Sequence, residues 1–372
     1  MRLLHLVDSL AIGGSESLAA SLARGLADSG VASVICGLGE GGALESRLER
    51  DAVPFLTLGA TDGVQPRAMW KLADLLVRKR CDVVISHHFR QLLHVAPAAF
   101  MLRRPVIHVE HDFHSYLDRP DIVKKMGYCL AAVQTFVGVS NEITSWFEKR
   151  IVGSEGKFRT IVNGVDVERF RRSESVRRRL RGSLHIAGDA IVVGTCARLE
   201  AVKDLTLLIR SFRSMLALLE KTAPWLASTA CLVMVGDGEE REKLQAVAEK
   251  SGLCGRCFLP GMVDNVDEWL SAFDIYAITS RDEGLPLSVM EAMSSSLPVV
   301  GVDVGSVSRL VNDHVGQLLA GRSPDEIGQV LAEFAGDYAR RHGCGKAARQ
   351  YIKKSYSMRA TVAAYLDLLP GC

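Results

Sequence analysis

The sequence lacks an excess of charge of either sign. Its 372 residues include 45 lysines and arginines against 43 aspartates and glutamates, which gives a formal net charge of +2. A chain so nearly balanced has no general electrostatic attraction for nucleic acid. We therefore expect no nucleic-acid partner, and any site for an anion must be a local one.

Long apolar runs are also missing. The opening residues have neither the apolar stretch nor the small-residue cleavage site of a signal peptide, and no segment has the length of a membrane-spanning helix. Four of the nine cysteines lie in or beside apolar, strand-like runs: Cys36, Cys81, Cys196 and Cys231. Such cysteines are typical of small buried side chains in a reducing compartment, which predicts a cytoplasmic protein. The single Cys254-x-x-Cys257 has no second pair near it, so a zinc or redox site is not expected.

What is present is an ordinary globular composition, 48% hydrophobic and 24% charged, over a length that favours two domains. Short apolar strands alternate with amphipathic helical stretches, as in a parallel sheet covered on both faces. A first series of strands is predicted at 3–7, 33–37, 82–86, 106–109 and 136–139, and a second at 191–196, 231–235, 275–278 and 299–302. The predicted fold class is α/β, with two Rossmann-like, doubly wound domains.

The arginine-rich segment 169–182 separates the two series and has hardly any apolar periodicity. We interpret it as a solvated connecting turn and helix, which ends a first domain at residue 182; contact with an anionic membrane or an acidic acceptor is the less favoured alternative. The second domain then covers 183–357. The chain beyond Ser323 is predicted to be helical, and we expect its last segment, 358–372, to pack back toward the first domain.

Two glycines, Gly13 and Gly14, lie in the loop after the first strand, just before a predicted helix. They let backbone approach a ligand closely at a helix N-terminus, where free N–H groups and the helix dipole favour a phosphate. A turn that merely ends a strand uses the same residues. The loop lacks Gly-x-Gly-x-x-Gly, which argues against a nicotinamide-dependent dehydrogenase.

Arg198 and Lys203 lie in the loop beyond the first strand of the second series. Ligands of open α/β sheets bind at the carboxyl ends of strands. Arg198 can fork onto two phosphate oxygens and Lys203 adds a compact charge, so together they would offset the negative charge of a departing diphosphate. At this point an ordinary surface loop fits the two residues equally well.

The most specific stretch runs from Glu283 to Glu291 and reads Glu-Gly-Leu-Pro-Leu-Ser-Val-Met-Glu. Pro286 suits the first turn of a helix, which puts Glu283 in the preceding loop and the amides of Gly284 and Leu285 at the positive end. Glu291 lies about two turns further along. We assign Glu283 to sugar hydroxyls and Glu291 to a ribose diol, because carboxylates accept hydrogen bonds from hydroxyls and repel a diphosphate. Without a ligand, Glu283 could be a helix-capping residue and Glu291 an exposed residue of the helix. These roles would explain each glutamate separately but not the whole run of residues.

In these motifs the sequence resembles the retaining glycosyltransferases of the GT-B fold, especially family 4. The matching positions are the Glu-x7-Glu pair Glu283 and Glu291, the diphosphate-binding pair Arg198 and Lys203, the glycine loop Gly13-Gly14, and the phrases at 162–170 and 235–241. The resemblance implies two domains facing each other across a cleft. It also implies transfer of a sugar from a nucleoside diphosphate sugar to an acceptor hydroxyl, with retention at the anomeric carbon and without a bound metal or cofactor.

Further expectations follow from the same resemblance. The acceptor would be a glycan or glycolipid in polysaccharide or glycolipid biosynthesis, and peripheral association with the inner membrane face is an open expectation. Contacts near Gly236 and Met262 would select the base. His111 looks like the histidine that lines the reaction centre on the acceptor side, where it can hydrogen-bond a sugar hydroxyl or exchange a proton. Four other histidines compete for that role: His87, His88, His108 and His114.

One phrase departs from the family. Where the family often has Gly-Gly-x-Pro-Glu, the chain has Gly305, Ser306, Val307, Ser308 and Arg309. We expect altered contacts there, or a segment that turns away from the ligand, and not a loss of activity. Two other functions stay open: a sugar-nucleotide epimerase with similar domains, against which the Glu-x7-Glu phrase argues, and a non-catalytic nucleotide or glycan binder, which the sequence excludes poorly.

Overall fold

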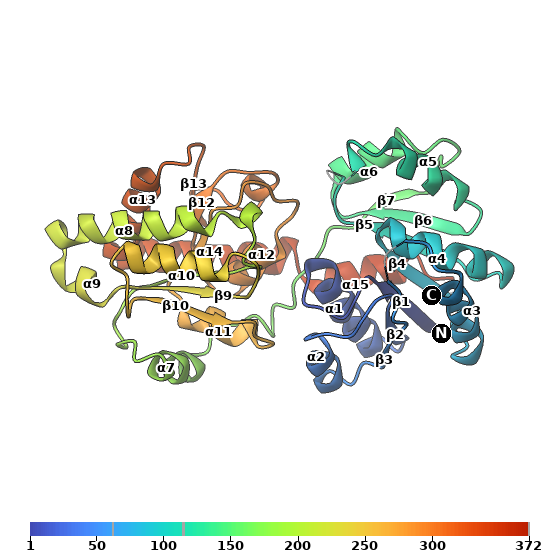
Figure 1. The fold of residues 1–372 in the computed structure, drawn as a ribbon, viewed down its shortest axis with the longest axis horizontal. Coiled ribbons are helices and arrows are strands. Elements are labelled where there is room, and N and C mark those ends of the chain that lie inside the picture. The colour runs from blue at the N-terminus through green and yellow to red at the C-terminus, as the bar shows by residue number, and fades with distance from the viewer. Residues whose placement is uncertain (62, 114–115, 371–372) are drawn as a thin grey trace. The chain divides into compact units, whose positions relative to one another are not determined.

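The computed structural model describes residues 1–61, 63–113 and 116–370, and the chain divides into two compact units (Figure 1). One unit is Met1–Gly164 completed by the C-terminal segment that begins at Met358, and the other is Val165–Ser357. The boundary predicted at residue 182 therefore moves to residue 164. Residues 165–182 belong to the second unit.

In the described part of the chain, the first unit has a seven-stranded parallel sheet in the order β3-β2-β1-β4-β5-β6-β7. Its strands are β1 (Arg2–Val7), β2 (Ala32–Gly37), β3 (Phe55–Thr57), β4 (Val83–His87), β5 (Val106–Glu110), β6 (Val133–Gly138) and β7 (Phe158–Thr160). Its helices are α1 (Gly14–Asp28), α2 (Glu45–Arg50), α3 (Pro66–Arg78), α4 (His88–Met101), α5 (Pro120–Tyr128), α6 (Asn141–Glu148) and α15 (Met358–Leu366). The central strands β4 and β5 are buried at every residue, as expected for a sheet with both faces covered.

Helix α15 packs on α1 although it comes from the C-terminal end of the described chain. Gly25 on α1 lies so close to Val362 that a Cβ at this glycine would be 2.6 Å from a Val362 methyl group. The Thr361 hydroxyl donates to the Val162 carbonyl at 3.0 Å, and Gln134 donates to a backbone carbonyl just beyond α15. The C-terminal segment is thus an integral layer of the first unit.

The second unit has a parallel sheet in the order β10-β9-β8-β11-β12-β13. Its strands are β8 (Val192–Cys196), β9 (Cys231–Val235), β10 (Cys257–Gly261), β11 (Ile275–Ile278), β12 (Val299–Val302) and β13 (Gly316–Leu319). Its helices are α7 (Glu174–Ser183), α8 (Leu205–Thr222), α9 (Pro224–Thr229), α10 (Arg241–Lys250), α11 (Val266–Ala272), α12 (Leu287–Ser294), α13 (Pro324–Gly336) and α14 (Tyr338–Ser355). Alternate strand residues enter two separate cores, as Val193 and Val192 do on β8, so each face carries its own apolar layer.

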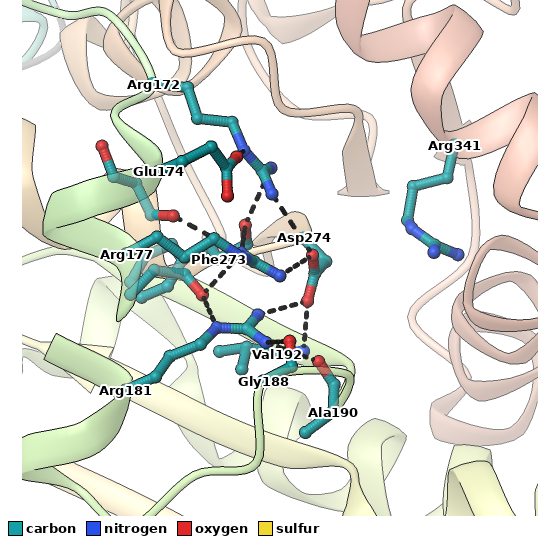
Figure 2. A network of polar contacts seen from close by, with 12 residues as sticks. Arg172, Glu174, Arg177, Arg181, Gly188, Ala190, Val192, Phe273, Asp274 and Arg341 are labelled. Carbon is teal, nitrogen blue, oxygen red and sulfur yellow. Dashed lines mark hydrogen bonds and ion pairs between the residues drawn. The ribbon is translucent and has the colours of Figure 1, made fainter. Parts of the chain in front are cut away.

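Most of helix α7 lies in the segment that we predicted to be solvated, and for two of its arginines that prediction is wrong. Arg177 and Arg181 are only 9% and 2% exposed. Both point to Asp274, the residue before β11, with nitrogen–oxygen distances of 2.6 Å each (Figure 2). Arg172 approaches the same carboxylate at 3.9 Å. The arginines therefore attach α7 to the sheet of the second unit.

The same guanidinium groups satisfy backbone carbonyls that would otherwise be buried without a donor. Arg177 and Arg181 both donate to the carbonyl of Ala272, the last residue of α11, and Arg181 also donates to Ala190 at 2.8 Å. Burial alone would raise the pKa of Asp274, but the charges of Arg181 and Arg177 outweigh it and lower that pKa. Burial lowers the pKa of Arg177 to about 10. A carboxylate held this way is a structural group, and breaking such a pair is costly.

None of the helices in the described ranges combines the length and the apolar character that crossing a bilayer requires.

Candidate active site

The carboxyl ends of β8 and β11 are where a ligand is expected in the second unit. The strand order runs outward from β8 on one side and from β11 on the other, so these neighbours form the point at which the order reverses. Open α/β sheets bind ligands at such a point, outside the carboxyl ends of the strands. The two loops are residues 197–204 and 279–286.

Lys203 and Glu283 meet across these two loops. The Lys203 Nζ is 2.7 Å from the Glu283 Oε1, and the side chains are only 20% and 11% exposed. The Ser280 hydroxyl donates to the same carboxylate oxygen at 2.5 Å. Charge-assisted hydrogen bonds with little access to water hold both groups in place. The cation predicted for phosphate and the carboxylate predicted for sugar therefore lie side by side.

Arg322, which follows β13, connects the two loops. Its guanidinium donates to the Asp204 carboxylate and to the Ser280 carbonyl, both at 2.8 Å, and to the Thr279 carbonyl at 2.6 Å. The Thr279 hydroxyl donates in turn to the carbonyls of Lys203 and Asp204. These bonds fix the backbone on both sides of the ion pair between Lys203 and Glu283.

Gly305 supports Glu283 from the loop after β12. Its φ of +55° is in the left-handed region, and a Cβ there would lie 1.7 Å from the Glu283 carbonyl oxygen. The neighbouring Ser306 N–H donates to the same carbonyl at 3.4 Å. Gly305 and Ser306, at the start of the segment that departs from the family pattern, are thus packed against Glu283. Ser308 and Arg309 are exposed in a short 3-10 helix, Val307–Arg309.

Arg198 has a carboxylate partner of its own. Its guanidinium is 2.5 Å from the Glu200 Oε1, and its side chain is 61% exposed. Arg198 and Lys203 thus share one loop, but each is paired with a different glutamate. A diphosphate that used both cations would have to compete with both carboxylates.

Gly236 and Met262 lie at the β9 and β10 end of the same sheet edge. The Gly236 N–H donates to the Gly261 carbonyl at 2.9 Å, and a Cβ at Gly236 would be 1.9 Å from the Ala197 carbonyl oxygen. Met262 follows Gly261 and is 47% exposed. The loop after β9 is therefore stacked on the loop that carries Arg198, with Met262 at its border.

Helix α12 begins at Leu287, one residue later than the sequence suggests, with Pro286 at its N-cap. Gly284 and Leu285 lie in the loop before it and are half-buried, as Glu291 is on the helix. The pKa of the buried Cys196 thiol is raised by burial and further by the charge of Glu291. Glu291 therefore acts on the carboxyl end of β8, the strand that precedes the Lys203 loop.

The first unit has the same kind of reversal point, between β1 and β4. Helix α1 begins there at Gly14, and Gly13 is its N-cap residue, so the predicted glycine loop does open a helix. Glu16, in the first turn of α1, is only 8% exposed. Its carboxylate points back toward Gly13, where an added Cβ would lie 2.3 Å from the Glu16 Oε2. A carboxylate of the chain itself thus lies at this helix N-terminus.

Glu110, at the end of β5, is the centre of a buried polar cluster. It accepts hydrogen bonds from His108 at 2.8 Å and from Tyr116 at 3.0 Å, and it lies 3.7 Å from His88. Burial alone would raise the pKa of Glu110, but the bonds from His108 and His88 outweigh it and lower the pKa to about 2. Burial alone would lower the pKa of His88, and Glu110 raises it instead. Within the described residues no group of His, Cys, Asp and Glu is arranged to hold a metal ion.

His111 follows this cluster and is half-buried. Its Nε2 is 3.0 Å from the Nδ1 of His87, and the two rings are stacked with centroids 5.3 Å apart. Burial lowers the pKa of His111 to about 3 and lowers that of His87 well below 6.5. Both rings are therefore neutral at neutral pH, which favours a hydrogen-bonding role for His111 over proton exchange. His114 lies outside the described residues.

Two families of known proteins match the chain, one mainly over the first unit and the other within the second. Glycosyltransferase Family 4 matches residues 12–169, and Glycosyl transferases group 1 matches residues 176–351. The chain belongs to the family 4, group 1 glycosyltransferases. The β8–β11 reversal point lies within the group 1 match, and β4 and the start of α1 lie within the Family 4 match, which begins after β1.

Two individual relatives of this family 4 chain have less than 30% sequence identity to it. The D-inositol 3-phosphate glycosyltransferase of Kribbella flavida is 29% identical over 217 residues, which are 55% of this chain and 50% of that protein. A GDP-mannose-dependent alpha-(1-6)-phosphatidylinositol monomannoside mannosyltransferase of Mycobacterium tuberculosis is 26% identical over 218 residues, 56% of this chain and 54% of its own. The matches thus span about half the length of these curated relatives.

The fold is that of a solved relative along the whole chain. The crystal structure of HepE from Anabaena, in complex with UDP and glucose, has a TM-score of 0.83 at 20% identity and covers 100% of this chain and 99% of its own. The GT-B fold of two Rossmann-like domains, expected from the sequence, is thereby confirmed.

The sequence motifs miss the residues that hold the site of this family 4 chain together. Arg322, Thr279 and Ser280 belong to none of them, although Ser280 lies only three residues before Glu283. Thr279 and Ser280 could have been found from the sequence, because they are polar residues directly beyond β11, whose end was predicted. Arg322 could not be found in this way, because β13, the edge strand before it, was not predicted.

Proposed function

We propose that this chain transfers a sugar from a nucleoside diphosphate sugar to an acceptor hydroxyl, with retention at the anomeric carbon, in polysaccharide or glycolipid synthesis. The observation that carries the proposal is the nearly buried pair of Lys203 and Glu283 at the β8–β11 reversal point. Relatives support the donor class: HepE was solved with UDP and glucose, and the mycobacterial relative is named GDP-mannose-dependent.

The ion pair has a direct role in this chemistry. A diphosphate that reaches Lys203 draws its charge away from Glu283, whose oxygen can then accept a hydrogen bond from a sugar hydroxyl. The bond between the anomeric carbon and the diphosphate oxygen breaks, and its electron pair leaves with the diphosphate. A bond from the acceptor oxygen to the anomeric carbon forms, and the acceptor proton passes to the leaving diphosphate.

The charge on the leaving group has to be offset where it develops. Lys203, Arg198 and the amides of Gly284 and Leu285 are proposed to do this in the second unit, in place of a metal ion or another cofactor. Glu291 is proposed to hold the ribose, and the backbone around Gly236 and Met262 to border the base.

The acceptor side is proposed to belong to the first unit. His111 would hydrogen-bond a hydroxyl, and Gly13 and Gly14 would let backbone approach the ligand. The acceptor would be a glycan or glycolipid, and access to a glycolipid would require peripheral association with a membrane.

Nucleotide binding is the first test. Isothermal titration calorimetry with UDP, GDP and ADP should find one preferred base, and Lys203→Met should weaken that binding roughly 10- to 100-fold, as expected for losing a hydrogen bond to a charged group. Arg340→Met removes a cation that pairs with Glu333 at 3.1 Å elsewhere in the same unit, and it should bind like the wild type. Unchanged affinity in Lys203→Met would contradict the proposed donor site.

Product analysis then separates the functions. A transferase releases nucleoside diphosphate only when an acceptor is present, and NMR of its product should show the donor's anomeric configuration, with turnover unaffected by EDTA. An epimerase would convert the sugar nucleotide without an acceptor. A binding protein would leave both substrates unchanged, and either result would overturn the proposal of transfer.

A further inference from the structure

His87 is the strongest unexplained polar group of the first unit. It is the last residue of β4, its side chain is fully buried, and none of the roles described above uses it. Its Nδ1 is 3.0 Å from the Nε2 of His111, whereas its Nε2 is buried without a hydrogen-bond partner. The ring of His5 also stacks on that of His87, with centroids 6.2 Å apart.

Only one of the two facing nitrogens can carry the hydrogen of this bond. If the His111 Nε2 donates, the proton of the neutral His87 ring must sit on its Nε2, where a buried N–H has no acceptor. If the His87 Nδ1 donates, the other N–H of the pair is the Nδ1–H of His111, a half-buried residue whose Nδ1 is not among the buried nitrogens without a partner. The unused group is then only the lone pair of the His87 Nε2. Orphaned buried N–H groups are the rarer of these two defects in proteins.

We propose that His87 is a positioning residue: its Nδ1–H donates to the His111 Nε2, which fixes His111 as the Nδ1–H tautomer and makes it a hydrogen-bond donor to the ligand. The hydrogen bond at one imidazole nitrogen decides which nitrogen keeps the proton, so a buried partner of fixed orientation imposes one tautomer. His111 then presents an N–H and has no free lone pair, so it binds a hydroxyl or phosphate oxygen and does not act as a general base.

This inference rests on the proposed function only for the identity of the ligand. The tautomer is a property of the first unit itself and can be measured without any substrate. Failure of sugar transfer and failure of the His87 proposal are therefore separate outcomes.

The first measurement is long-range ¹H–¹⁵N NMR correlation of the full chain with ¹⁵N-labelled histidine, which distinguishes the two neutral tautomers. The wild type should show His111 protonated at Nδ1. In His87→Leu, which removes the donor, the His111 resonances should move to the Nε2–H form or to a mixture. In His87→Asn, whose amide nitrogen replaces the Nδ1 donor, the wild-type pattern should return.

Turnover should follow the tautomer. We expect His87→Leu to lose roughly 10- to 100-fold in kcat/KM, the range for losing an oriented hydrogen bond in the site, and His87→Asn to recover most of it. His5→Leu is the matched control, because it removes a buried histidine of the same stack that has no hydrogen-bond partner, and it should change neither the tautomer of His111 nor kcat/KM.

Two results would overturn the proposal. One is a wild-type spectrum with His111 protonated at Nε2, which needs no variant and so does not depend on whether His87→Leu folds. The other is a His87→Asn protein that folds, as judged by its amide spectrum, but has the tautomer and the turnover of His87→Leu.

Discussion

Acid should destabilise the first unit, and His5 offers the most direct test. Its ring is fully buried on β1 without a hydrogen-bond partner, and burial lowers its pKa from 6.5 to about 4. Above pH 6.5 the ring is neutral in the folded and unfolded chain alike. As the pH falls from 6.5 toward 4, the unfolded chain binds a proton that the folded chain does not, so the free energy of unfolding decreases. By pH 5 the loss from this one residue is about 2 kcal/mol, since one pH unit corresponds to about 1.4 kcal/mol.

The other ionisable groups near His5 do not oppose the loss of stability between pH 6.5 and 4.5. His87 and His111 also have lowered pKa values, so they add to the loss on acidification. His88 has a raised pKa, so its stabilisation is fully present below 6.5 and is lost only as the pH rises through the raised value. Glu110, lowered from 4.5 to about 2, stabilises above 4.5 and loses its effect below. Between pH 4.5 and 6.5 the decrease therefore comes from the histidines with lowered pKa.

The variant His5→Leu isolates one of these contributions. Hydrogen–deuterium exchange, corrected for the intrinsic effect of pH, gives the opening free energy of amides in β1 and β2 at pH 7.5 and at pH 5. The loss between the two pH values should be smaller by about 2 kcal/mol in His5→Leu than in the wild type. Amides of β8 and β9 are the internal control, because the histidines of the second unit, His185, His314 and His342, are exposed. Equal losses in wild type and variant would refute the reasoning.

Two further predictions concern the second unit. Arg181→Met should lower the free energy of unfolding of the second unit by about 3–5 kcal/mol, measured by chemical denaturation, because Asp274 stays buried with one partner fewer. The double variant Arg181→Met/Asp274→Asn should lose less than the sum of the losses in the two single variants. Strictly additive losses would contradict the coupling of the two residues. Gly305→Ala places a methyl group against the Glu283 carbonyl and should weaken nucleoside diphosphate binding by about 10-fold or more in calorimetry. Gly252→Ala has a similar positive φ of +71° but nothing within 4 Å, so it should bind normally, and equal affinities in the two variants would refute the role of the Gly305 contact.

The sequence predicts the interior strands well and the edge strands poorly. The bounds of β9, β11 and β12 are as predicted, because these strands are buried on both faces and read as apolar runs. The four strands that were not predicted, β3, β7, β10 and β13, are the four sheet edges. Most of their residues are half-exposed, and β10 even contains Pro260, which an edge strand tolerates. Edge strands depend on a neighbour for their conformation, and periodicity does not reveal that neighbour.

The site shows the same limit. Lys203 and Glu283 could be proposed from the sequence because each belongs to a run of contiguous residues that matches a family motif. Arg322 could not be, because its partner Asp204 lies 118 residues away. Arg177 and Arg181 of α7 were misjudged for the same reason. A run of arginines predicts solvent exposure, whereas Asp274, 93 residues beyond Arg181, and the carbonyls of Ala272 and Ala190 provide buried partners.

The membership of α15 in the first unit affects how the chain can fold as it is made. A ribosome adding 5–20 residues per second needs roughly 10–40 s to pass from Gly164 to Met358. Throughout that interval the surface of α1 around Gly25, where Val362 later packs, has no cover. The unit synthesised first is therefore the one completed last, and a released chain that ends before Met358 would contain every residue of the second unit but would leave this surface of α1 exposed for a chaperone to shield.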